Sequence, residues 1–596
     1  MLKRTHMCGE LRPEHVGQTV TLAGWVNTYR DQGKGLIFID LRDREGLAQV
    51  VFNLREIDES AVTEARSLRR EDVVAVQGLV RTRIGGANPK LRTGEIELLA
   101  QQLEVLNKAD TPPILPDEHE AQKIAEEKRL QYRYIDLRRP KMQQILRTRY
   151  EVTRVARQFF AEKGFIEIET PFLIKTTPEG ARDFIVPSRL YPGKWYALPQ
   201  SPQIFKQILM ASGFDRYLQI VRCFRDEDPR ADRQAEFSQI DLEMSFVDRD
   251  DVIKMMTSFT QHLWKEILGV DIGDIPIMTY HDAMDRYGID RPDLRFGLEI
   301  EDVSTLAAKT DFRVFQDALG KPNGVVKAMR VPGGASKLTR KMTDGYSEFV
   351  KTFRAGGAPT VKLTENGFET GVAKFVSSIA DELKQRLNLE VGDIVFFTAD
   401  MWSIAAKAMG ELRNKIARDL DLINESAWKF VWIVDTPMFE YDEDQQRWVA
   451  MHHPFTSPMP DQLDMLETDP GACISTGYDI VCNGSEIAGG SIRIHQPPMQ
   501  QKVFRLLGIS EEEAEQKFGF LLRALRYGAP PMGGIAFGLD RLVMLLVGTN
   551  NIRDVIAFPK TQTGQDLMTE APGPADEAQL RELHVRVDDR SSKPEH

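Results

Sequence analysis

Short runs in which apolar and polar residues alternate fill the first 107 positions of the chain. These runs lie at 18–26, 36–43, 47–53, 73–83 and 95–106. A period of two residues is typical of strands with one buried face. A helical stretch around residues 60–70 separates the third run from the fourth. Five strands with one helix in that place predict a small Greek-key barrel of the OB type, whose open face binds oligonucleotides.

The pattern changes at residues 108–140, where prolines precede a charged helical run. The pair Pro112–Pro113 interrupts any helix, so we expect the barrel to end just before it. The composition of the segment indicates a hinge between the barrel and a larger body.

From residue 141 the spacing of apolar residues predicts helices as well as strands. An amphipathic helix leads into GFIEIETPFL (164–173), and the apolar runs 217–224 and 237–246 predict two strands joined by a charged loop. A glycine-rich strand and an amphipathic helix occupy 533–545, after an apolar strand at 428–439 and a hairpin at 475–495. Residues 288–422 leave this pattern, with two predicted helices at 375–387 and 401–420.

The charged loop between 225 and 236 allows two interpretations. Its side chains could pair with one another on a solvated edge hairpin, where each pair contributes about 0–1 kcal/mol. Alternatively, guanidinium groups held by a rigid sheet bind a phosphate or carboxylate through two hydrogen bonds, and the neighbouring carboxylates hold a metal or orient them. The loop by itself does not decide between these interpretations.

Composition narrows the class of protein. A chain of 596 residues and 67.7 kDa predicts several domains. No stretch approaches about 18 uninterrupted apolar residues, and the amino terminus lacks the apolar run of a signal peptide, so we expect a cytoplasmic protein without a membrane span. The cysteines stand alone without a CxxC pair, which argues against a disulfide framework or a cysteine zinc site: Cys8, Cys223, Cys473 and Cys482.

The formal net charge of −12 argues against a nucleic-acid partner if it is taken as a sum, because phosphate contacts dominate such binding. However, residues 1–107 carry similar numbers of basic and acidic side chains. The barrel could therefore bind RNA without net repulsion.

One pair of carboxylates is a candidate metal site. Asp479 and Glu486 are seven positions apart, too far for one side of a helical turn, and converge only if a hairpin turns at Cys482 to Gly484. Two carboxylates without cysteine or suitably spaced histidine favour Mg²⁺, which prefers oxygen ligands and takes the remainder from phosphate and water. The sequence shows neither a P-loop nor a Ser/His/Asp or Cys/His nucleophile arrangement.

Three stretches, 164–173, 221–246 and 533–545, resemble in this order motifs 1, 2 and 3 of class II aminoacyl-tRNA synthetases. With QSPQIFKQ (200–207), MHHPFTSP (451–458) and GGSIRIH (489–495), the chain is similar to the bacterial-type aspartyl-tRNA synthetases over nearly its whole length. The resemblance implies an α+β multidomain chain with an OB-type barrel, an antiparallel catalytic sheet and an inserted α+β domain. The implied domains are an anticodon-binding barrel (1–107), a hinge (108–140), a catalytic domain in two parts (141–287 and 423–559), an insertion (288–422) and a C-terminal extension (560–596).

The resemblance also implies an activity and its site residues. The enzyme would activate L-aspartate with ATP to aspartyl-adenylate and transfer it to tRNA(Asp), and to tRNA(Asn) in the non-discriminating members. Arg225, Glu227 and Arg541 would be catalytic. Aspartate would lie among Glu179, Ser201, Gln203, Lys206, Arg225, Asp241, His452 and Arg493. ATP would contact Arg225, Asp226, Glu227, Arg233, Gln234, Glu486, Gly538, Leu539, Asp540 and Arg541, with Mg²⁺ on Asp479 and Glu486. The anticodon would contact Arg30, Phe38, Gln49 and Glu97, and Gln32 would affect the choice of tRNA.

Chemistry agrees with this assignment, because the attacking carboxylate is ionised at neutral pH and needs no general base. The site must instead align the reactants and neutralise charge at the α-phosphate. We expect a buried Arg493 to reject asparagine by about 3–5 kcal/mol, since asparagine would leave its charge uncompensated. His452 could add pH-dependent recognition of the ammonium end.

Other interpretations remain open at this point. Lys206 could be a solvent-facing helix residue, and Phe38 could belong to the barrel core. An asparaginyl or lysyl synthetase shares the barrel and the three motifs, although Lys206, Arg493 and the insertion argue against both. A non-catalytic, tRNA-binding relative with an OB barrel is the other alternative. A homodimer is implied by resemblance alone.

Overall fold

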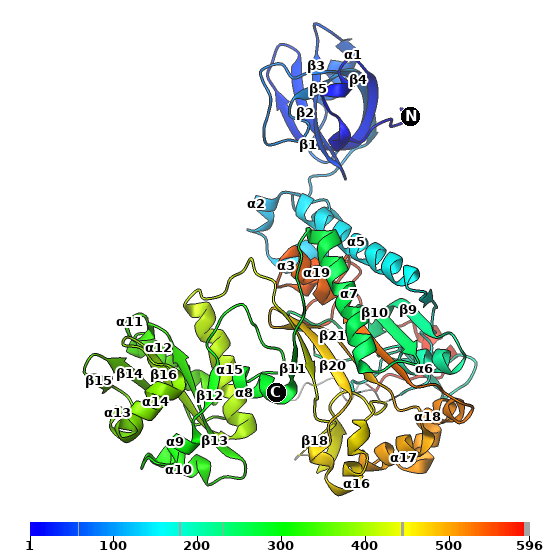
Figure 1. Ribbon diagram of the computed structural model, residues 1–596. Coiled ribbons are helices and arrows are strands. Elements are labelled where there is room, and N and C mark those ends of the chain that lie inside the picture. Colours follow the sequence, from blue (N-terminus) through cyan, green and yellow to red (C-terminus); the bar gives the residue numbers. More distant parts are fainter. Residues whose placement is uncertain (58, 178–179, 229, 443–445, 589–596) are drawn as a thin grey trace. The chain divides into compact units, whose positions relative to one another are not determined.

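The computed structural model describes residues 1–57, 59–177, 180–228, 230–442 and 446–588 (Figure 1). The chain divides into two compact units. The first comprises Met1–Arg149, Pro229–Ala231 and Thr549–Pro574, and the second comprises Tyr150–Asp228, Asp232–Gly548 and Ala575–His596.

The first unit contains a closed barrel with the strand order β1-β2-β3-β5-β4, which confirms the predicted OB barrel. Its elements are η1 (Cys8–Glu10), η2 (Pro13–His15), β1 (Thr19–Asp31), β2 (Leu36–Asp43), β3 (Gly46–Asn53), α1 (Glu59–Arg66), β4 (Val73–Thr82) and β5 (Ile96–Asn107). Strand alternation buries Ile37 and Ile39 in the core, while Phe38 between them stays half-buried on the outer face. The interpretation of Phe38 as barrel core is therefore wrong.

The segment after the barrel is folded into short helices. These are α2 (Glu118–Ala121), α3 (Glu126–Gln131) and α4 (Arg133–Asp136), which lead into the long helix α5 (Pro140–Glu162). The buried Arg133 donates hydrogen bonds to the backbone oxygens of Arg553 and Ile556, both at 2.8 Å. Arg553 belongs to η6 (Ile552–Asp554). Residues 549–574 therefore pack against the predicted hinge within the first unit.

A largely antiparallel sheet with the order β11-β17-β20-β21-β22-β10-β9-β6 forms the centre of the second unit. Its strands are β6 (Ile166–Glu167), β9 (Arg216–Phe224), β10 (Glu236–Ser245), β11 (Ile277–Thr279), β17 (Phe430–Val434), β20 (Gly477–Cys482), β21 (Ser485–Ile492) and β22 (Met532–Gly538). The charged loop joins β9 to its antiparallel partner β10, as predicted. Strand β22 pairs with both β10 and β21, so sequence stretches far apart become neighbours.

The helices that pack against this sheet include α6 (Gln203–Ala211), α7 (Arg249–Leu268), α8 (Tyr280–Tyr287) and α19 (Leu539–Val547). Helix α18 (Glu511–Arg526) packs against α6, and α17 (Pro497–Leu506) packs against α18. Helix α7 packs through Phe259, whose ring lies 5.3 Å from that of Phe537 on β22. Asp248 caps the start of α7, and Gly269 ends it with a φ of 69°. Smaller elements are β7 (Ile185–Pro187), β8 (Trp195–Ala197), β18 (Phe439–Asp442), β19 (Arg447–Ala450), η4 (Pro460–Gln462), α16 (Met465–Thr468), η5 (Pro470–Ala472) and α20 (Glu577–Glu582).

The inserted segment forms its own sheet with the order β12-β13-β16-β14-β15, drawn in green in Figure 1. Its strands are β12 (Ile300–Asp302), β13 (Gly324–Val331), β14 (Thr360–Thr364), β15 (Gly367–Glu369) and β16 (Ile394–Met401). Its helices are α9 (Ser304–Ala307), α10 (Arg313–Leu319), α11 (Gly334–Lys337), α12 (Arg340–Lys351), α13 (Ala373–Val376), η3 (Ser377–Ile379), α14 (Ala380–Leu387) and α15 (Trp402–Asp419). This confirms a mixed α/β insertion. Within the described residues, no helix combines the length and apolar character needed to cross a membrane.

Candidate active site

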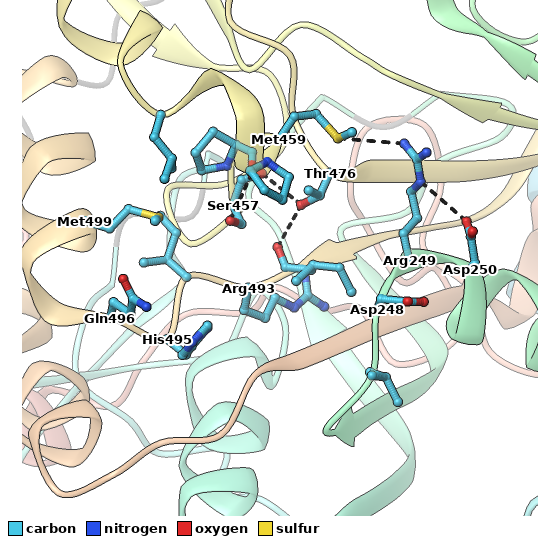
Figure 2. Close-up of a pocket in the computed structure, with 16 residues that line it drawn as sticks. Asp248, Arg249, Asp250, Ser457, Met459, Thr476, Arg493, His495, Gln496 and Met499 are labelled. Atoms are coloured by element: carbon cyan, nitrogen blue, oxygen red, sulfur yellow. Dashed lines mark hydrogen bonds and ion pairs between the residues drawn. The ribbon is translucent and has the colours of Figure 1, made fainter.

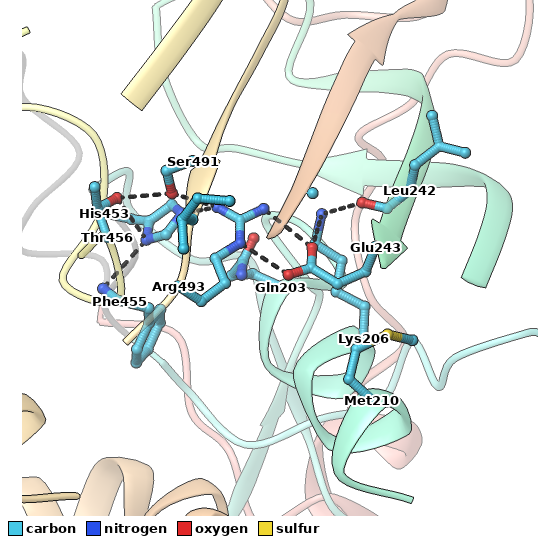
Figure 3. Close-up of polar contacts among 12 residues, drawn as sticks. Gln203, Lys206, Met210, Leu242, Glu243, His453, Phe455, Thr456, Ser491 and Arg493 are labelled. Atoms are coloured by element: carbon cyan, nitrogen blue, oxygen red, sulfur yellow. Dashed lines mark hydrogen bonds and ion pairs between the residues drawn. The ribbon is translucent and has the colours of Figure 1, made fainter. Parts of the chain in front are cut away.

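Four buried charged side chains meet where α6, β10 and the end of β21 come together, and Figure 3 shows three of them, Lys206, Glu243 and Arg493. Lys206 Nζ lies 2.7 Å from Asp241 Oδ1 and 3.3 Å from Glu243 Oε2. Arg493 donates from Nε and Nη2 to the two Glu243 oxygens, at 2.9 and 3.1 Å. Asp241 and Glu243 are two positions apart on β10, so their side chains share one face of the sheet. The two cations and two carboxylates compensate one another.

Lys206 is 2% exposed, so its interpretation as a solvent-facing helix residue is wrong. Beside it, Asp241 Oδ2 and Gln203 Nε2 are buried and have no hydrogen-bond partner among the described residues. Burial raises the pKa of Asp241 to about 6, against the opposing effect of Lys206. A buried acceptor on β10 and a buried amide donor on α6 are thus left without partners, and the ammonium and carboxylate groups of an amino acid could satisfy them.

The neighbouring histidines are neutral at pH 7. Arg493 can only donate, so His453 Nε2 accepts from Arg493 Nη1 at 2.7 Å. Burial and then Arg493 lower the pKa of His452 to about 4, and the same causes hold the pKa of His453 well below its ordinary value. His453, Glu243 and Ser491, whose hydroxyl accepts from Arg493 at 2.7 Å, were missed by sequence reasoning. The sequence could have indicated Glu243, because residues two positions apart on a strand share one face and Asp241 was already a candidate.

The loop between β9 and β10 places a guanidinium over an aromatic ring. Arg225 stacks on Phe237 at 5.0 Å, and its buried Nε has no partner among the described residues. Arg233 Nη1 lies 3.3 Å from Glu227 Oε2, while Asp226 pairs with Arg182 at 2.8 Å. The loop therefore combines a stacked arginine with partly exposed ion pairs. A phosphate could bind to the arginines of these pairs.

The start of α19 adds a second arginine. Arg541 donates to the backbone oxygen of Glu486 at 2.7 Å, and Asp540 accepts from the backbone N–H of Ser238 at 2.8 Å. Gly538 is the N-cap of α19, and the side chain of Leu539 is buried. The predicted ATP residues of β21, β22 and α19 thus lie on adjacent elements of the second unit. Gln234 and Ser201 are buried and partly buried, respectively, whereas Glu179 lies outside the described residues.

The predicted metal pair comes together across Gly489. A Cβ at Gly489 would stand 2.5 Å from Asp479 Oδ1 and 3.4 Å from Glu486 Oε1. The hairpin turns at Asn483 and Gly484, as predicted, and a β-bulge between Ile480 and Val481 shifts the register of the two strands.

Burial and the nearby Glu486 carboxylate raise the pKa of Asp479 well above its ordinary value. A facing pair of carboxylates with a small cradle between them suits a divalent cation shared with phosphate oxygens. No cluster of three or more candidate ligand side chains occurs in the part of the chain that the structure describes. A cation here would therefore depend on the nucleotide for further ligands.

The predicted anticodon residues share one outer face of the barrel. Arg30 and Phe38 are opposite one another on β1 and β2. Arg30 pairs with Asp40 at 3.1 Å, and Gln49 donates to Glu97 at 2.9 Å. Gln32 lies exposed in the turn between β1 and β2. A half-buried aromatic ring beside hydrogen-bonding side chains forms a surface on which a base can stack.

A cavity of about 450 Å³ lies beside β21 (Figure 2). Ile492 and Ile494 line it, with Met459, Leu463 and Met499. Because neighbouring side chains on a strand point to opposite faces, the Arg493 guanidinium turns away from these isoleucines toward Glu243. Apart from Arg493, none of the predicted substrate residues lines this cavity, so it is distinct from the polar site.

Comparisons with known proteins agree on the family. A model described as "tRNA synthetases class II (D, K and N)" matches residues 125–562, and one described as "OB-fold nucleic acid binding domain" matches 20–106. The aspartate–tRNA(Asp/Asn) ligase of Caldanaerobacter subterraneus subsp. tengcongensis is 51% identical over 591 residues, which cover 98% of this chain and 99% of that protein. The aspartate–tRNA ligase of Staphylococcus carnosus is 50% identical over 590 residues, covering 98% of this chain and 100% of that protein.

Solved structures support the fold. The asparaginyl-tRNA synthetase of Pyrococcus horikoshii in complex with asparaginyl-adenylate aligns with a TM-score of 0.58 at 20% identity. The alignment covers 94% of this chain and 99% of that one. At this identity the likeness concerns the fold alone.

Proposed function

The chain belongs to the class II tRNA synthetases, among the aspartate–tRNA ligases, and on that premise we propose that it joins L-aspartate to the 3′ end of tRNA(Asp) in two steps. Aspartate first attacks the α-phosphate of ATP through its carboxylate, which forms aspartyl-adenylate and releases pyrophosphate. The aspartyl group then passes to the terminal ribose of the tRNA. The observation that carries this proposal is the buried cluster of Lys206, Asp241, Glu243 and Arg493.

We assign the ammonium group of aspartate to Asp241 Oδ2, a buried acceptor without a partner among the described residues. The side-chain carboxylate would approach Lys206 and Arg493. Asparagine would present an amide NH₂ to these donors, which cannot accept its hydrogens. This replaces the expectation of an uncompensated arginine, because Glu243 already neutralises Arg493 through two hydrogen bonds.

Positively charged side chains would stabilise the nucleotide. Arg225 would neutralise charge that develops at the α-phosphate, and Arg233 and Arg541 would hold the distal phosphates. Glu227 and Gln234 would contact adenosine or its phosphates. Asp479 and Glu486 would hold Mg²⁺, which supplies charge neutralisation on the phosphate oxygens when bound.

The barrel supports a proposal for the RNA partner. Phe38 would stack on an anticodon base while Arg30, Gln49 and Glu97 contact base edges or backbone. Some relatives carry the name aspartate–tRNA(Asp/Asn) ligase and others aspartate–tRNA ligase, and Gln32 lies in the turn where this choice would be made. Parallel charging of tRNA(Asp) and tRNA(Asn) tests this choice.

The proposal extends to assembly and location. Ile166, Phe172 and Leu173 are 49%, 42% and 54% exposed. Three exposed apolar side chains within the stretch 164–173 favour burial of this surface in a homodimer. We also propose the cytoplasm as the site of action and the domain limits given by the resemblance.

Aspartate-dependent exchange between pyrophosphate and ATP tests the first step. Purified protein should exchange label with aspartate and not with asparagine or lysine. Exchange with either of the latter would favour the corresponding synthetase. Absence of exchange with all three amino acids would favour a non-catalytic tRNA-binding relative.

A further inference from the structure

Two buried hydroxyls connect the backbone of β20 to the ring of His452. Thr436 Oγ1 lies 3.0 Å from His452 Nε2 and 2.8 Å from Ser475 Oγ. The backbone N–H of Gly477 donates to the same Ser475 Oγ at 3.0 Å. Thr436 is 4% exposed and Ser475 is fully buried. These contacts form a chain from Gly477 through Ser475 and Thr436 to His452.

The direction of this chain follows from its donors. Gly477 N–H can only donate, so Ser475 Oγ accepts there. In the described part of the chain, the remaining polar neighbour of the Ser475 hydroxyl is Thr436 Oγ1, so the Ser475 proton points to it. The Thr436 proton then points to His452 Nε2. Nε2 is thereby an acceptor, and the ring proton lies on Nδ1.

The hydroxyl groups of Thr436 and Ser475 also fit tightly around the imidazole ring of His452. A Cβ at Gly477 would stand 2.7 Å from His452 Nε2, and 2.9 Å from both Ser475 Oγ and Thr436 Oγ1. A side chain at this position would displace all three atoms. Glycine therefore leaves room for the hydroxyls to reach the imidazole.

We propose that Thr436 and Ser475 are positioning residues that hold His452 as its Nδ1–H tautomer and thereby present a hydrogen-bond donor to a carboxylate of the amino-acid substrate. The identity of that substrate rests on the proposed function. Nδ1 forms no hydrogen bond within the described residues, and an N–H group donates to a carboxylate but cannot accept from an ammonium group. This assignment replaces the expectation that His452 recognises the ammonium end.

The charges around His452 are compatible with a neutral ring. Arg493, directly after β21, disfavours the imidazolium, and Asp290, in the segment after α8, favours it. A proton on Nε2 would be donated to Thr436 Oγ1, and one of the two hydroxyl protons, that of Thr436 or that of Ser475, would then have no acceptor among the described residues. The hydrogen bonds of Thr436 and Ser475 and the charge of Arg493 thus both favour the neutral form of the His452 ring.

The proposal is tested with Thr436→Val, which removes the hydroxyl and keeps the shape, and with Thr436→Ser, which restores it. In pyrophosphate exchange, Thr436→Val should raise the KM for aspartate about tenfold, with smaller effects on kcat and on the KM for ATP. Thr436→Ser should recover most of the loss. Thr468→Val, on exposed α16, is the matched control and should behave as the wild type.

A second readout does not depend on activity. Nitrogen chemical shifts of ¹⁵N-histidine-labelled protein, assigned by comparison with His452→Asn, report the tautomer directly. The wild type and Thr436→Ser should show Nδ1–H, and Thr436→Val a mixture. An Nε2–H tautomer in the wild type would overturn the proposal, as would an unchanged KM in folded Thr436→Val. Absence of exchange in the wild type would instead count against the proposed function, while the tautomer remains measurable.

Discussion

Lys206 and Asp241 form a buried ion pair of 2.7 Å, with side chains that are 2% and 1% exposed. Helix α6 supplies the lysine and β10 the aspartate, so the pair fixes helix to sheet at the floor of the site. Glu243 and Arg493 extend it into a cluster without excess charge. Removal of one member of such a cluster destabilises the fold, because it leaves a buried charge uncompensated.

Lys206→Met should therefore lower the free energy of unfolding by about 3–5 kcal/mol and abolish aspartate-dependent exchange. Urea denaturation measures the first effect and the exchange assay the second. Lys265→Met, on the exposed side of α7, controls for loss of a lysine. Equal stability of the two variants would show that the buried pair does not stabilise the fold.

The KM for aspartate should rise as the pH falls through about 6. The pKa of Asp241 is raised to about 6, so below that pH the carboxyl becomes protonated and loses the charge that faces the substrate ammonium. Exchange rates at several aspartate concentrations, from about one unit below the transition to about two units above it, measure this. A KM that is constant across this range would contradict the assignment of Asp241 Oδ2.

Gly489→Ala should raise the Mg²⁺ concentration needed for half-maximal exchange by about tenfold or more. The added methyl would stand 2.5 Å from Asp479 Oδ1, and so fill the cradle between the two carboxylates. Titration with MgCl₂, together with Mn²⁺ binding measured by electron paramagnetic resonance, detects the change without relying on activity alone. Gly345→Ala, where a Cβ would meet open space, is the control. An unchanged dependence of exchange on the Mg²⁺ concentration would contradict the assignment of Asp479 and Glu486 as metal ligands.

Phe38→Ala should weaken tRNA binding and leave the first step intact. Loss of one base stack costs about 1–3 kcal/mol, so the KM for tRNA(Asp) should rise about tenfold or more. Pyrophosphate exchange, which needs no tRNA, should be unchanged. Val16→Ala, 44% exposed in the same barrel, is the control. A decrease in exchange would indicate damage beyond RNA recognition.

Local patterns predicted the barrel and the hairpins because period-two alternation and turn residues act over a few positions. The strands at 36–43 and 73–83 were placed within one residue of β2 and β4 for this reason. The same alternation could have identified Glu243 from Asp241. It also separates the outward Phe38 from its buried neighbours, which composition alone did not reveal.

The charged cluster depended on long-range pairing that no local pattern contains. Arg493 and Glu243 are 250 positions apart and meet because β22 joins β10 to β21. The bulge beside Val481 likewise shifts the register of the two strands that carry Asp479 and Glu486. The Thr436–Ser475 chain arises from three separate segments. Such relationships become visible only once the sheet is assembled.

The most direct test of the central claim is aminoacylation with radiolabelled aspartate, using transcripts of bacterial tRNA(Asp) and tRNA(Asn) in parallel. The account predicts aspartate-dependent charging of tRNA(Asp), and the tRNA(Asn) reaction shows whether the enzyme discriminates between the two. Failure to charge either transcript under conditions in which a known aspartate–tRNA ligase is active would contradict the account.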